Sequence, residues 1–488
     1  MHSRGRCSGP NPGNGTTMRF QLIQHQIELD FHVKNHIDML ERHGVDVADL
    51  RRRLRALRES VPAQALADDE RYNELQAEVL RLDGDTEVHE PWDLERIMAA
   101  RPTPRLDSYE QELSDDDLRD RIHGAWLGRI AGCVLGKPLE WFMREEHSRP
   151  RVRKYLTEAG EYPLRYYASE GMVMPYYAIL ERKGLCDDRH KAPGIPALRG
   201  RIRSACADDD TNYTLIALRK CQRFGREFSL DDTIDFLYRA MGHGVANHSR
   251  NVFVRNRAMG LAYPAAASFM NDGRECVRLQ IRTDLYGYIS PGHMEHAARL
   301  AWHDAAATGV ESGLYGALWT TACVAAAFVE SDPEVIVQRG LEQIPAECAF
   351  RDELESTIDT VTRNGNDFDA TLDDIDSRWN RYAPNLAAPN CAIIAAGLLH
   401  GKGDFARSLC LCVCGGYDTD SNGATLGSIL GAMYGARAIP SEWKDVFSDT
   451  LQGGVAGIER IAISQAARET YEILKANPVP REPLAATS

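Results

Sequence analysis

Apolar residues recur at helical spacing through the first hundred positions of the chain. A helix with a break at Gly44 is predicted over residues 20–60, because its apolar positions fall on one face; they are Phe20, Ile23, Ile27, Phe31, Ile37, Leu50, Leu54 and Leu57. A further helix is predicted over residues 71–82. A linker that contains a short helix follows, framed by Pro91, Pro102 and Pro104. Residues 18–118 are therefore interpreted as a helical extension.

A new unit begins at Ser114. This serine precedes three aspartates and then Leu118 and Ile122, which is typical of a capped helix start with acids near the positive end of the helix dipole. From there to about residue 477 nearly every segment has a helical period, and only residues 162–175 and 286–289 favour strands. We therefore predict a large, mainly α domain over residues 119–478.

Two predicted helices carry glycine at every fourth position. The glycines are Gly124, Gly128, Gly132 and Gly136 in the first helix, and Gly423, Gly427, Gly431 and Gly435 in the second. Positions four apart share one helix face, and each glycine costs about 1 kcal/mol relative to alanine. Close packing of one backbone on another is the usual compensation. We expect two central helices that pack tightly against each other.

Three consecutive aspartates, Asp208, Asp209 and Asp210, precede the helix that begins near Thr211. Their charges repel one another, and the helix dipole stabilises only one or two of them. A divalent cation would stabilise all three, because residues at a loop-to-helix junction can point toward one ion. An exposed acidic cap is the alternative for this motif taken alone.

A second acidic segment, Asp418-Thr419-Asp420-Ser421, lies between the apolar run 409–413 and the second glycine helix. Asp418 and Asp420 are two positions apart and cannot share a helix face, which predicts a turn. The apolar, glycine-rich flanks indicate that this turn is buried, and buried carboxylates are costly unless they are paired or bind metal. Oxygen ligands of this kind favour Mg²⁺, Mn²⁺ or Ca²⁺ over Zn²⁺.

Other candidate motifs have ordinary structural explanations. Asp231-Asp232-Thr233 follows Ser229 and opens a helix, as a capping motif does. The acids at positions 373, 374 and 376 are expected at the surface. The three cysteines of the apolar run are interpreted as small buried thiols, because no suitably spaced fourth ligand accompanies them; they are Cys410, Cys412 and Cys414.

The chain has 488 residues, and 57 Lys and Arg against 71 Asp and Glu give it a formal net charge of −14. This balance argues against a protein whose main role is to bind nucleic acid or an anionic membrane. No apolar run approaches the ~20 residues of a transmembrane helix. The 12 cysteines are too sparse for a disulfide scaffold, so a cytoplasmic protein is expected. Residues 1–17 are predicted to be disordered, and residues 479–488 to form a flexible tail.

Three motifs in this order resemble those of the ADP-ribosylglycohydrolase family, which includes the dinitrogenase-reductase-activating glycohydrolase. The family's glycine-spaced helix and following acid read Gly124 to Glu140 here. Its Thr-Asp-Asp-Thr motif reads Asp208 to Thr211, and its Gly-Gly-Asp-Thr-Asp-Thr motif reads Gly416 to Ser421. The resemblance covers about residues 118–478 and leaves the extension outside.

The resemblance implies an all-α orthogonal helical bundle with a central site for two Mg²⁺ or Mn²⁺ ions. It implies an enzyme that hydrolyses an N- or O-ribosyl bond. The implied metal ligands are Asp208, Asp209, Asp210, Asp418, Asp420 and Ser421. Asp208 and Ser421 stand where the family has threonine, and Asp208 thereby adds a negative charge. Glu140 matches the family's acid beside the substrate ribose, and the expected catalytic residues are Glu140, Asp209 and Asp418.

The implied substrate is an ADP-ribosylated or ADP-ribose-like molecule. The family often has a Thr-His pair where this chain has Thr308-Gly309, which favours a variant that acts on a small nucleotide or nucleoside derived from NAD. A non-catalytic, crystallin-like binding protein is a further alternative. The extension is a candidate for partner binding or homodimer formation. Residues that line the substrate site, or alternatively have structural roles, are expected among Asn256, Asp284, Tyr286 and Asn390.

Overall fold

The computed structural model describes residues 32–61, 63–84, 88–111, 113–144, 148–183, 188–192, 194–240, 248–455 and 457–476. The disorder predicted for residues 1–17, the beginning of the predicted helix over residues 20–31 and the tail predicted over residues 479–488 lie outside this part of the chain. The chain divides into two compact units. One comprises residues 1–86 and 174–192, and the other comprises residues 87–173 and 193–488.

The smaller unit contains the helices predicted near the N-terminus. Residues 32–42 are helical, and the chain then turns at Gly44, where φ is +81°. The elements that follow are α2 (Ala48–Ser60), η1 (Ala63–Asp68) and α3 (Glu70–Gly84), and residues 174–192 add the end of α7 (Glu170–Arg182) and η3 (Arg189–Lys191). Their apolar stripes form one core, which includes Val33, Ile37, Leu40, Leu50, Leu54, Leu57, Tyr72, Leu75 and Val79.

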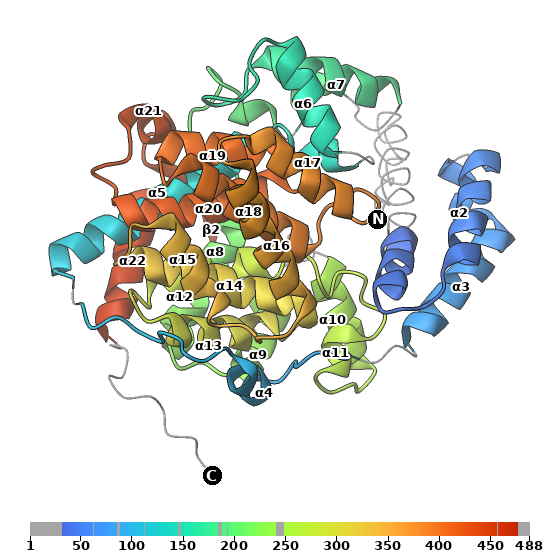
Figure 1. Cartoon of the computed structure of the whole chain (residues 1–488), viewed down its shortest axis with the longest axis horizontal. Helices are drawn as coiled ribbons and strands as arrows, with labels where there is room; N and C mark the ends of the chain where they lie inside the picture. Colours follow the sequence, from blue (N-terminus) through green and yellow to red (C-terminus); the bar gives the residue numbers. More distant parts are fainter. Residues whose placement is uncertain are drawn as a thin grey trace, which may run out of the picture. The chain divides into compact units, whose positions relative to one another are not determined.

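The larger unit is a helical assembly, so the all-α prediction is confirmed (Figure 1). Its first elements are α4 (Leu94–Ala100), α5 (Asp115–Gly136), η2 (Glu140–Arg144), α6 (Ser148–Glu158), the start of α7, η4 (Ile195–Ala197), α8 (Asp209–Phe224), α9 (Leu230–Ala240), α10 (His248–Ala258), α11 (Ala265–Ser268), η5 (Gln280–Arg282) and α12 (Asp284–Tyr288). There follow α13 (Met294–Ala305), α14 (Glu311–Ala327), α15 (Pro333–Leu341), α16 (Ala349–Asn364), α17 (Phe368–Trp379), α18 (Ala387–Gly401), α19 (Phe405–Cys414), α20 (Thr419–Tyr434), α21 (Ser441–Lys444), η6 (Asp445–Phe447) and α22 (Ile463–Ala476). Strands β1 (Thr450–Val455) and β2 (Ile458–Ala462) pair as an antiparallel hairpin.

The two segments predicted to favour strands are not strands. Residues 161–169 form a loop that leads into α7, and residues 284–288 form α12. The aromatic residues that gave these segments their strand-like composition are instead buried by packing. Tyr167 packs on Trp443 with ring centroids 5.0 Å apart, and Tyr286 packs on Phe228 at 5.2 Å. Burial of rings therefore explains the composition without a sheet.

The two glycine helices, α5 and α20, pack against each other along their glycine faces, as predicted (Figure 1). A Cβ atom added at Gly128 would lie 2.0 Å from the carbonyl oxygen of Gly427, and one added at Gly132 would lie 1.8 Å from that of Gly423. No side chain fits between backbones at this separation, which accounts for glycine at every fourth position. The helices run antiparallel, so the end of α5 meets the start of α20, where the Thr419 hydroxyl donates to the Gly136 carbonyl oxygen at 2.9 Å.

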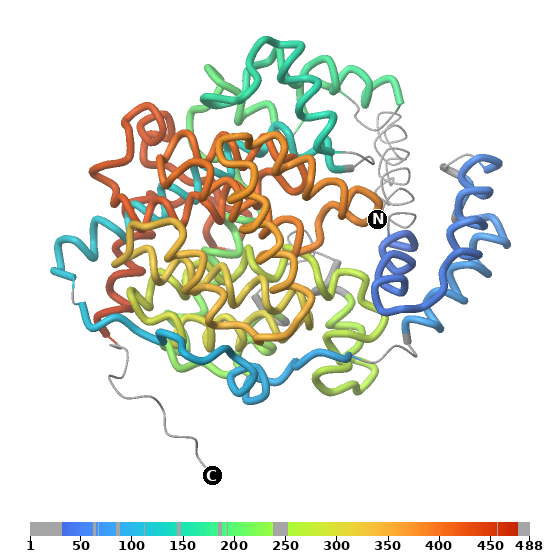
Figure 2. The backbone as a smooth tube through the Cα atoms, viewed as in Figure 1, coloured from blue at the N-terminus to red at the C-terminus, as the bar shows by residue number. Residues whose placement is uncertain are grey.

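Residues 88–111 form a strap along the surface of the larger unit (Figure 2, blue). The Tyr109 amide donates to the Gly292 carbonyl at 2.8 Å, and the Trp302 indole donates to the Trp92 carbonyl at 3.0 Å. The Arg101 guanidinium, whose side chain is 3% exposed, binds Glu295 at 2.9 Å and Gln343 at 2.6 Å. The boundary predicted at residue 118 stays a prediction. Across the described segments, no helix is both long enough and apolar enough to cross a membrane.

Candidate metal centre

The aspartate triplet lies at the N-terminus of α8. Asp208 is the N-cap residue, and its carboxylate accepts a hydrogen bond from the Asp210 amide at 2.9 Å. Asp208 and Asp210 are buried, whereas Asp209 is half-buried. The triplet is therefore not an exposed acidic cap, and its carboxylates are withdrawn from water, as a metal site requires.

The second acidic segment is a sharp turn before α20. Gly416 and Tyr417 have φ of +73° and +61°. The turn is fixed from outside, because the Asp418 amide donates to Asn390 Oδ1 at 3.1 Å and the Tyr417 amide donates to Ser148 Oγ at 2.9 Å. Asp418 is 7% exposed and Asp420 is 1% exposed. Both the turn and its burial agree with the sequence-based prediction.

The carboxylates of three separate segments converge on one amine. The ammonium nitrogen of Lys137 lies 2.7 Å from Glu140 Oε2, 2.5 Å from Asp208 Oδ2 and 3.1 Å from Asp420 Oδ2. The Ser421 hydroxyl donates to Asp210 Oδ2 at 3.1 Å. The ends of α5, α8 and α20 therefore meet in a single buried acidic cluster, defined here as Glu140, Asp208, Asp209, Asp210, Asp418 and Asp420.

Burial and mutual repulsion raise the pKa of most carboxyls in this acidic cluster. The pKa of Asp209 is raised to about 7, first by burial and then by the charge of Asp208. Burial and neighbouring acids also raise the pKa of Asp420 and Asp210 well above the usual range. Burial acts to raise the pKa of Asp208 as well, but the charge of Lys137 together with hydrogen bonds from Lys137 and Asp210 outweighs it, and the pKa is lowered. A carboxyl with a raised pKa still holds its proton near neutral pH, and a divalent cation that binds there can displace this proton.

The donor atoms of the acidic cluster fit a hard divalent cation. Among the described residues, Asp420 Oδ1 is buried and has no hydrogen-bond partner. Oxygen atoms from carboxylates and a hydroxyl are the ligands that Mg²⁺ and Mn²⁺ prefer. The thiol of Cys133 also lies here, since ligand atoms of Cys133, Asp208 and Asp210 all lie within 4.8 Å of one another. Burial beside these acids raises the pKa of the Cys133 thiol, which keeps it a neutral neighbour.

Arg129 holds Asp210 of the acidic cluster in place, and this role was not predicted from the sequence. Its fully buried guanidinium lies 2.5 Å from Asp284 Oδ2 and 3.3 Å from Asp210 Oδ1, and it donates to the Asp210 carbonyl at 2.8 Å. It therefore ties the start of α8 to α5. A single arginine within the apolar, glycine-spaced stretch 124–136 of α5 is the sequence signal that could have indicated a buried partner. Lys137 was missed as well, although it directly follows the last glycine of α5.

The residues expected to line the substrate site have structural partners instead. Asn390 fixes the Asp418 turn, and Asn256 donates to the carbonyls of Ala266 and Phe269. Asp284 accepts from Arg129 and from Ser428, and the Tyr286 hydroxyl donates to Asp304 at 2.6 Å. All four are fully buried, which supports their structural alternative; they are Asn256, Asp284, Tyr286 and Asn390.

Position 309 has no space for the histidine of the family's Thr-His pair. A Cβ added at Gly309 would lie 2.2 Å from Leu279 Cδ2 and 2.5 Å from the Arg274 carbonyl oxygen. The hydroxyl of the neighbouring Thr308 accepts from Arg282 at 2.6 Å. The departure from the family pattern is therefore built into the packing around this loop.

The motifs set aside in the sequence have ordinary roles. Asp232 forms a reciprocal cap with Ser229 at the start of α9, at 2.8 and 3.1 Å. Asp373 is exposed, and Asp374 and Asp376 are partly exposed; Asp376 also accepts a hydrogen bond from Tyr417. The three cysteines of α19 are buried thiols, as predicted; they are Cys410, Cys412 and Cys414.

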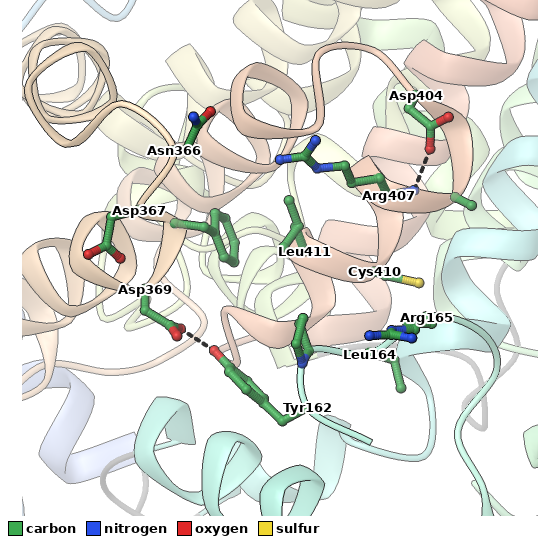
Figure 3. Close-up of a pocket in the computed structure, with 13 residues that line it drawn as sticks. Tyr162, Leu164, Arg165, Asn366, Asp367, Asp369, Asp404, Arg407, Cys410 and Leu411 are labelled. Carbon is green, nitrogen blue, oxygen red and sulfur yellow. Dashed lines mark hydrogen bonds between the residues drawn. The ribbon is translucent and has the colours of Figure 1, made fainter. Parts of the chain in front are cut away.

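A cavity of about 550 Å³ lies apart from the acidic cluster (Figure 3). It is lined by the 162–165 loop and by the first residues of α17 and α19, and none of the predicted site residues reaches it. Charged side chains of both signs face it, and Asp369 is held by Tyr162 (Figure 3). This mixed lining does not specify a ligand.

Comparison with known proteins agrees with the motifs. The model of a family described as ADP-ribosylglycohydrolase matches residues 114–475. A solved structure described as an ADP-ribosylglycohydrolase-related protein complex is 18% identical, aligns with 74% of this chain and 99% of its own chain, and gives a TM-score of 0.46. No curated protein matches the chain.

Proposed function

Because the chain belongs to the ADP-ribosylglycohydrolase family, we propose that it is a divalent-metal-dependent hydrolase of a ribosyl glycosidic bond. The substrate class is an ADP-ribosylated or ADP-ribose-like molecule. One observation carries this proposal: three motifs, separated by up to about 280 positions, contribute carboxylates to the same buried cluster, as the Lys137–Asp420 contact shows. Glycosidic hydrolysis passes through an oxocarbenium-like state, which carboxylates stabilise.

We assign the metal-binding role to Asp209, Asp418 and Asp420, supported by Asp208, Asp210 and Ser421. A bound Mg²⁺ or Mn²⁺ would hold ribose hydroxyls and make a water molecule more acidic. The residues of the chain hold the ligands in place: Asn390 orients the turn of Asp418, and Arg129 holds the start of α8. The number of bound ions depends also on Lys137, because its ammonium already occupies space among these carboxylates.

Glu140 has the role of orienting the attacking water or the substrate, or of carrying a proton between them. Its side chain is 17% exposed, more than those of Asp208 and Asp420, so it faces the open side of the cluster. Lys137 binds Oε2 at 2.7 Å, which leaves Oε1 for water or substrate. With Asp209 and Asp418, Glu140 completes the proposed catalytic set.

A small NAD-derived nucleotide or nucleoside is the second candidate substrate. The packing of Gly309 favours it, since a histidine cannot be placed beside Thr308 to contact a larger substrate in the usual way. A non-catalytic binding protein remains the alternative from another class. The retained acidic cluster supports the enzyme, because its six acids outnumber Lys137 and Arg129, the cations paired with them, and an excess of buried carboxylates has no structural benefit.

The test is product release from a panel of substrates with added Mg²⁺ or Mn²⁺. The panel contains ADP-ribosyl-arginine, ADP-ribosyl-serine, ADP-ribose-1″-phosphate, NAD and nicotinamide mononucleotide. We expect one of them to be hydrolysed, and we expect Asp209→Asn and Asp418→Asn to lower the rate at least ~100-fold, as loss of a catalytic group does.

Asp231→Asn is the matched control, because Asp231 is an exposed member of a similar motif at the start of α9. Its rate should equal that of the unaltered chain. The proposal would be contradicted if both cluster variants hydrolysed the substrate at the rate of the unaltered chain, or if chelation of the metal left that rate unchanged. Absence of both hydrolysis and metal binding would favour the binding protein.

A further inference from the structure

Lys137 lies inside the acidic cluster and not at its rim. It is the residue after α5, and its amide donates to the Cys133 carbonyl at 2.9 Å, which continues the helical path into the site. Its side chain is 13% exposed. The position of this ammonium is therefore set by the end of α5, in the same way as the position of Glu140 three residues later.

The ammonium group has as many hydrogens as it has carboxylate partners. The three partners come from three segments: Glu140 at 2.7 Å, Asp208 at 2.5 Å and Asp420 at 3.1 Å. An ammonium has three donors and no acceptor; Lys137 donates hydrogen bonds to Glu140 and Asp420 and forms an ion pair with Asp208. One oxygen of each partner is committed to Lys137, and a divalent ion on the same three oxygens would lie next to a like charge.

The residue that departs from the family motif is a direct partner of Lys137. Asp208 stands where the family motif has threonine, and it adds one negative charge. The shortest contact of the Lys137 ammonium is to Asp208 Oδ2, at 2.5 Å, and the Asp208 side chain is fully buried. The lysine thus contributes a positive charge that offsets the added acid.

Other oxygens of the acidic cluster are not bound to Lys137. Asp210 is held by Arg129 and by the Ser421 hydroxyl. Within the described part of the chain, Asp420 Oδ1 is buried without a hydrogen-bond partner. Asp209 and Asp418 both interact electrostatically with Glu140 and with Arg278, and Asp418 also interacts with Asp420. This set has enough donors for one octahedral ion whose remaining positions are filled by water.

We infer that Lys137 takes the place of one of the two cations implied by the family resemblance, so that this chain binds a single divalent ion beside Asp209, Asp418 and Asp420. The inference rests on the proposed function, because it treats the acidic cluster as the metal centre. It assigns Lys137 as a positioning residue that holds Glu140, Asp208 and Asp420.

The test counts ions in the full chain after chelation. Mn²⁺ is titrated in by calorimetry, and the bound ions are examined by electron paramagnetic resonance. The unaltered chain should bind one Mn²⁺ and give the signal of an isolated ion. Lys137→Met should bind two and give the signal of an exchange-coupled pair. Lys154→Met is the matched control, because Lys154 is 58% exposed and its ion pair is with the exposed Glu158 four residues later; it should bind one.

A double variant keeps the test decisive if Lys137→Met does not fold. Lys137→Met with Asp208→Thr removes one charge of each sign, so the net charge is unchanged, and it restores the family's threonine. It should also bind two ions. Two coupled ions in the unaltered chain would overturn the inference while the proposed function stands. One ion in a folded lysine variant would overturn it too, and no ion in any variant would overturn both.

Discussion

Arg129 is the residue on which the placement of the acidic cluster depends most directly. It lies on α5 and binds Asp284 from α12 and both the side chain and the carbonyl of Asp210 at the start of α8. All three side chains are buried. Such an ion pair gains little relative to an apolar replacement, but breaking it by removing one partner leaves buried charges uncompensated.

We therefore predict that Arg129→Met lowers the free energy of unfolding by about 3–5 kcal/mol. The change removes the cation and leaves two buried carboxylates. Urea denaturation at neutral pH measures the effect. Arg96→Met is the control, because Arg96 is 74% exposed, and it should change stability by less than about 0.5 kcal/mol. Equal stability of the two variants would contradict the role given to Arg129.

The raised pKa of Asp209 leads to a second prediction at the scale of single residues. Its pKa is raised to about 7 in the folded, metal-free chain, from an ordinary 3.8. The folded state then keeps a proton that the unfolded state has already released, so this group lowers stability progressively as pH rises from about 4 to about 7. Asp209→Asn removes that contribution.

Denaturation of metal-free protein at pH 5 and pH 8 checks this sign. From pH 5 to pH 8 the free energy of unfolding should fall more for the unaltered chain than for the variant. Saturating Mg²⁺ should restore the stability of the unaltered chain at pH 8 but not change that of the variant. Parallel pH profiles for the two proteins would show that Asp209 titrates normally.

The sequence allowed prediction of the carboxylates but not of the residues that pair with them. Asp208 to Asp210 and Asp418 to Asp420 are local patterns, and their excess charge is visible without the fold. Arg129 and Lys137 have partners that lie far away in the sequence, such as Asp284 and Asp420. Their roles depend on how α5, α8 and α20 meet, which no local pattern specifies.

The pair of helices α5 and α20 determines the site at the next scale. Their antiparallel packing brings the end of one to the start of the other, and the glycines allow backbone carbonyls to lie where side chains normally would. The cost of glycine in a helix, about 1 kcal/mol at each position, is offset by this close approach. The acidic cluster therefore lies on a rigid support.

Gly132→Ala should lower the free energy of unfolding by about 3 kcal/mol, because the added methyl would lie 1.8 Å from the Gly423 carbonyl oxygen and would force the helices apart. Thermal unfolding measures it. Gly171→Ala is the matched control: Gly171 is an exposed helical residue in α7 with its nearest neighbour atom 3.7 Å away, so alanine should be neutral or stabilise by up to about 1 kcal/mol. Similar unfolding temperatures for both variants would contradict the packing argument.

Helices were predictable at this scale and the hairpin was not. Helical period and capping signals, such as Ser114 before α5, depend on neighbouring residues only. β1 contains Gly453 and Gly454, and a Cβ at Gly453 would lie 2.1 Å from the Ile458 carbonyl oxygen. Glycines required by close strand contact hide the alternation that identifies a strand.

At the scale of the larger unit, the strap of residues 88–111 adds contacts that lie outside the family match. It joins α13, α14 and the segment after α15 through Trp92, Arg101 and Tyr109. The strap therefore stabilises the domain that carries the site. Dimer formation through residues 18–118 stays a prediction.

Arg101→Met should lower the free energy of unfolding by about 2 kcal/mol, because it removes charge-assisted hydrogen bonds to Glu295 and Gln343 from a buried position. Arg105→Met is the control within the strap, since the ion pair of Arg105 is with the exposed Asp107 and its own side chain is 28% exposed. Chemical denaturation compares the two. Equal free energies of unfolding for the two variants would show that the contacts of Arg101 in the strap add little stability.

The central claim is that the meeting ends of α5, α8 and α20 form a divalent-metal centre of a glycohydrolase. The most direct measurement is anomalous X-ray diffraction from crystals of the chain that contain Mn²⁺. The account predicts an anomalous peak among Asp209, Asp418 and Asp420, with Lys137 still bound to Asp208. A chain saturated with Mn²⁺ that shows no peak in this acidic cluster, or shows its peak elsewhere, would contradict it.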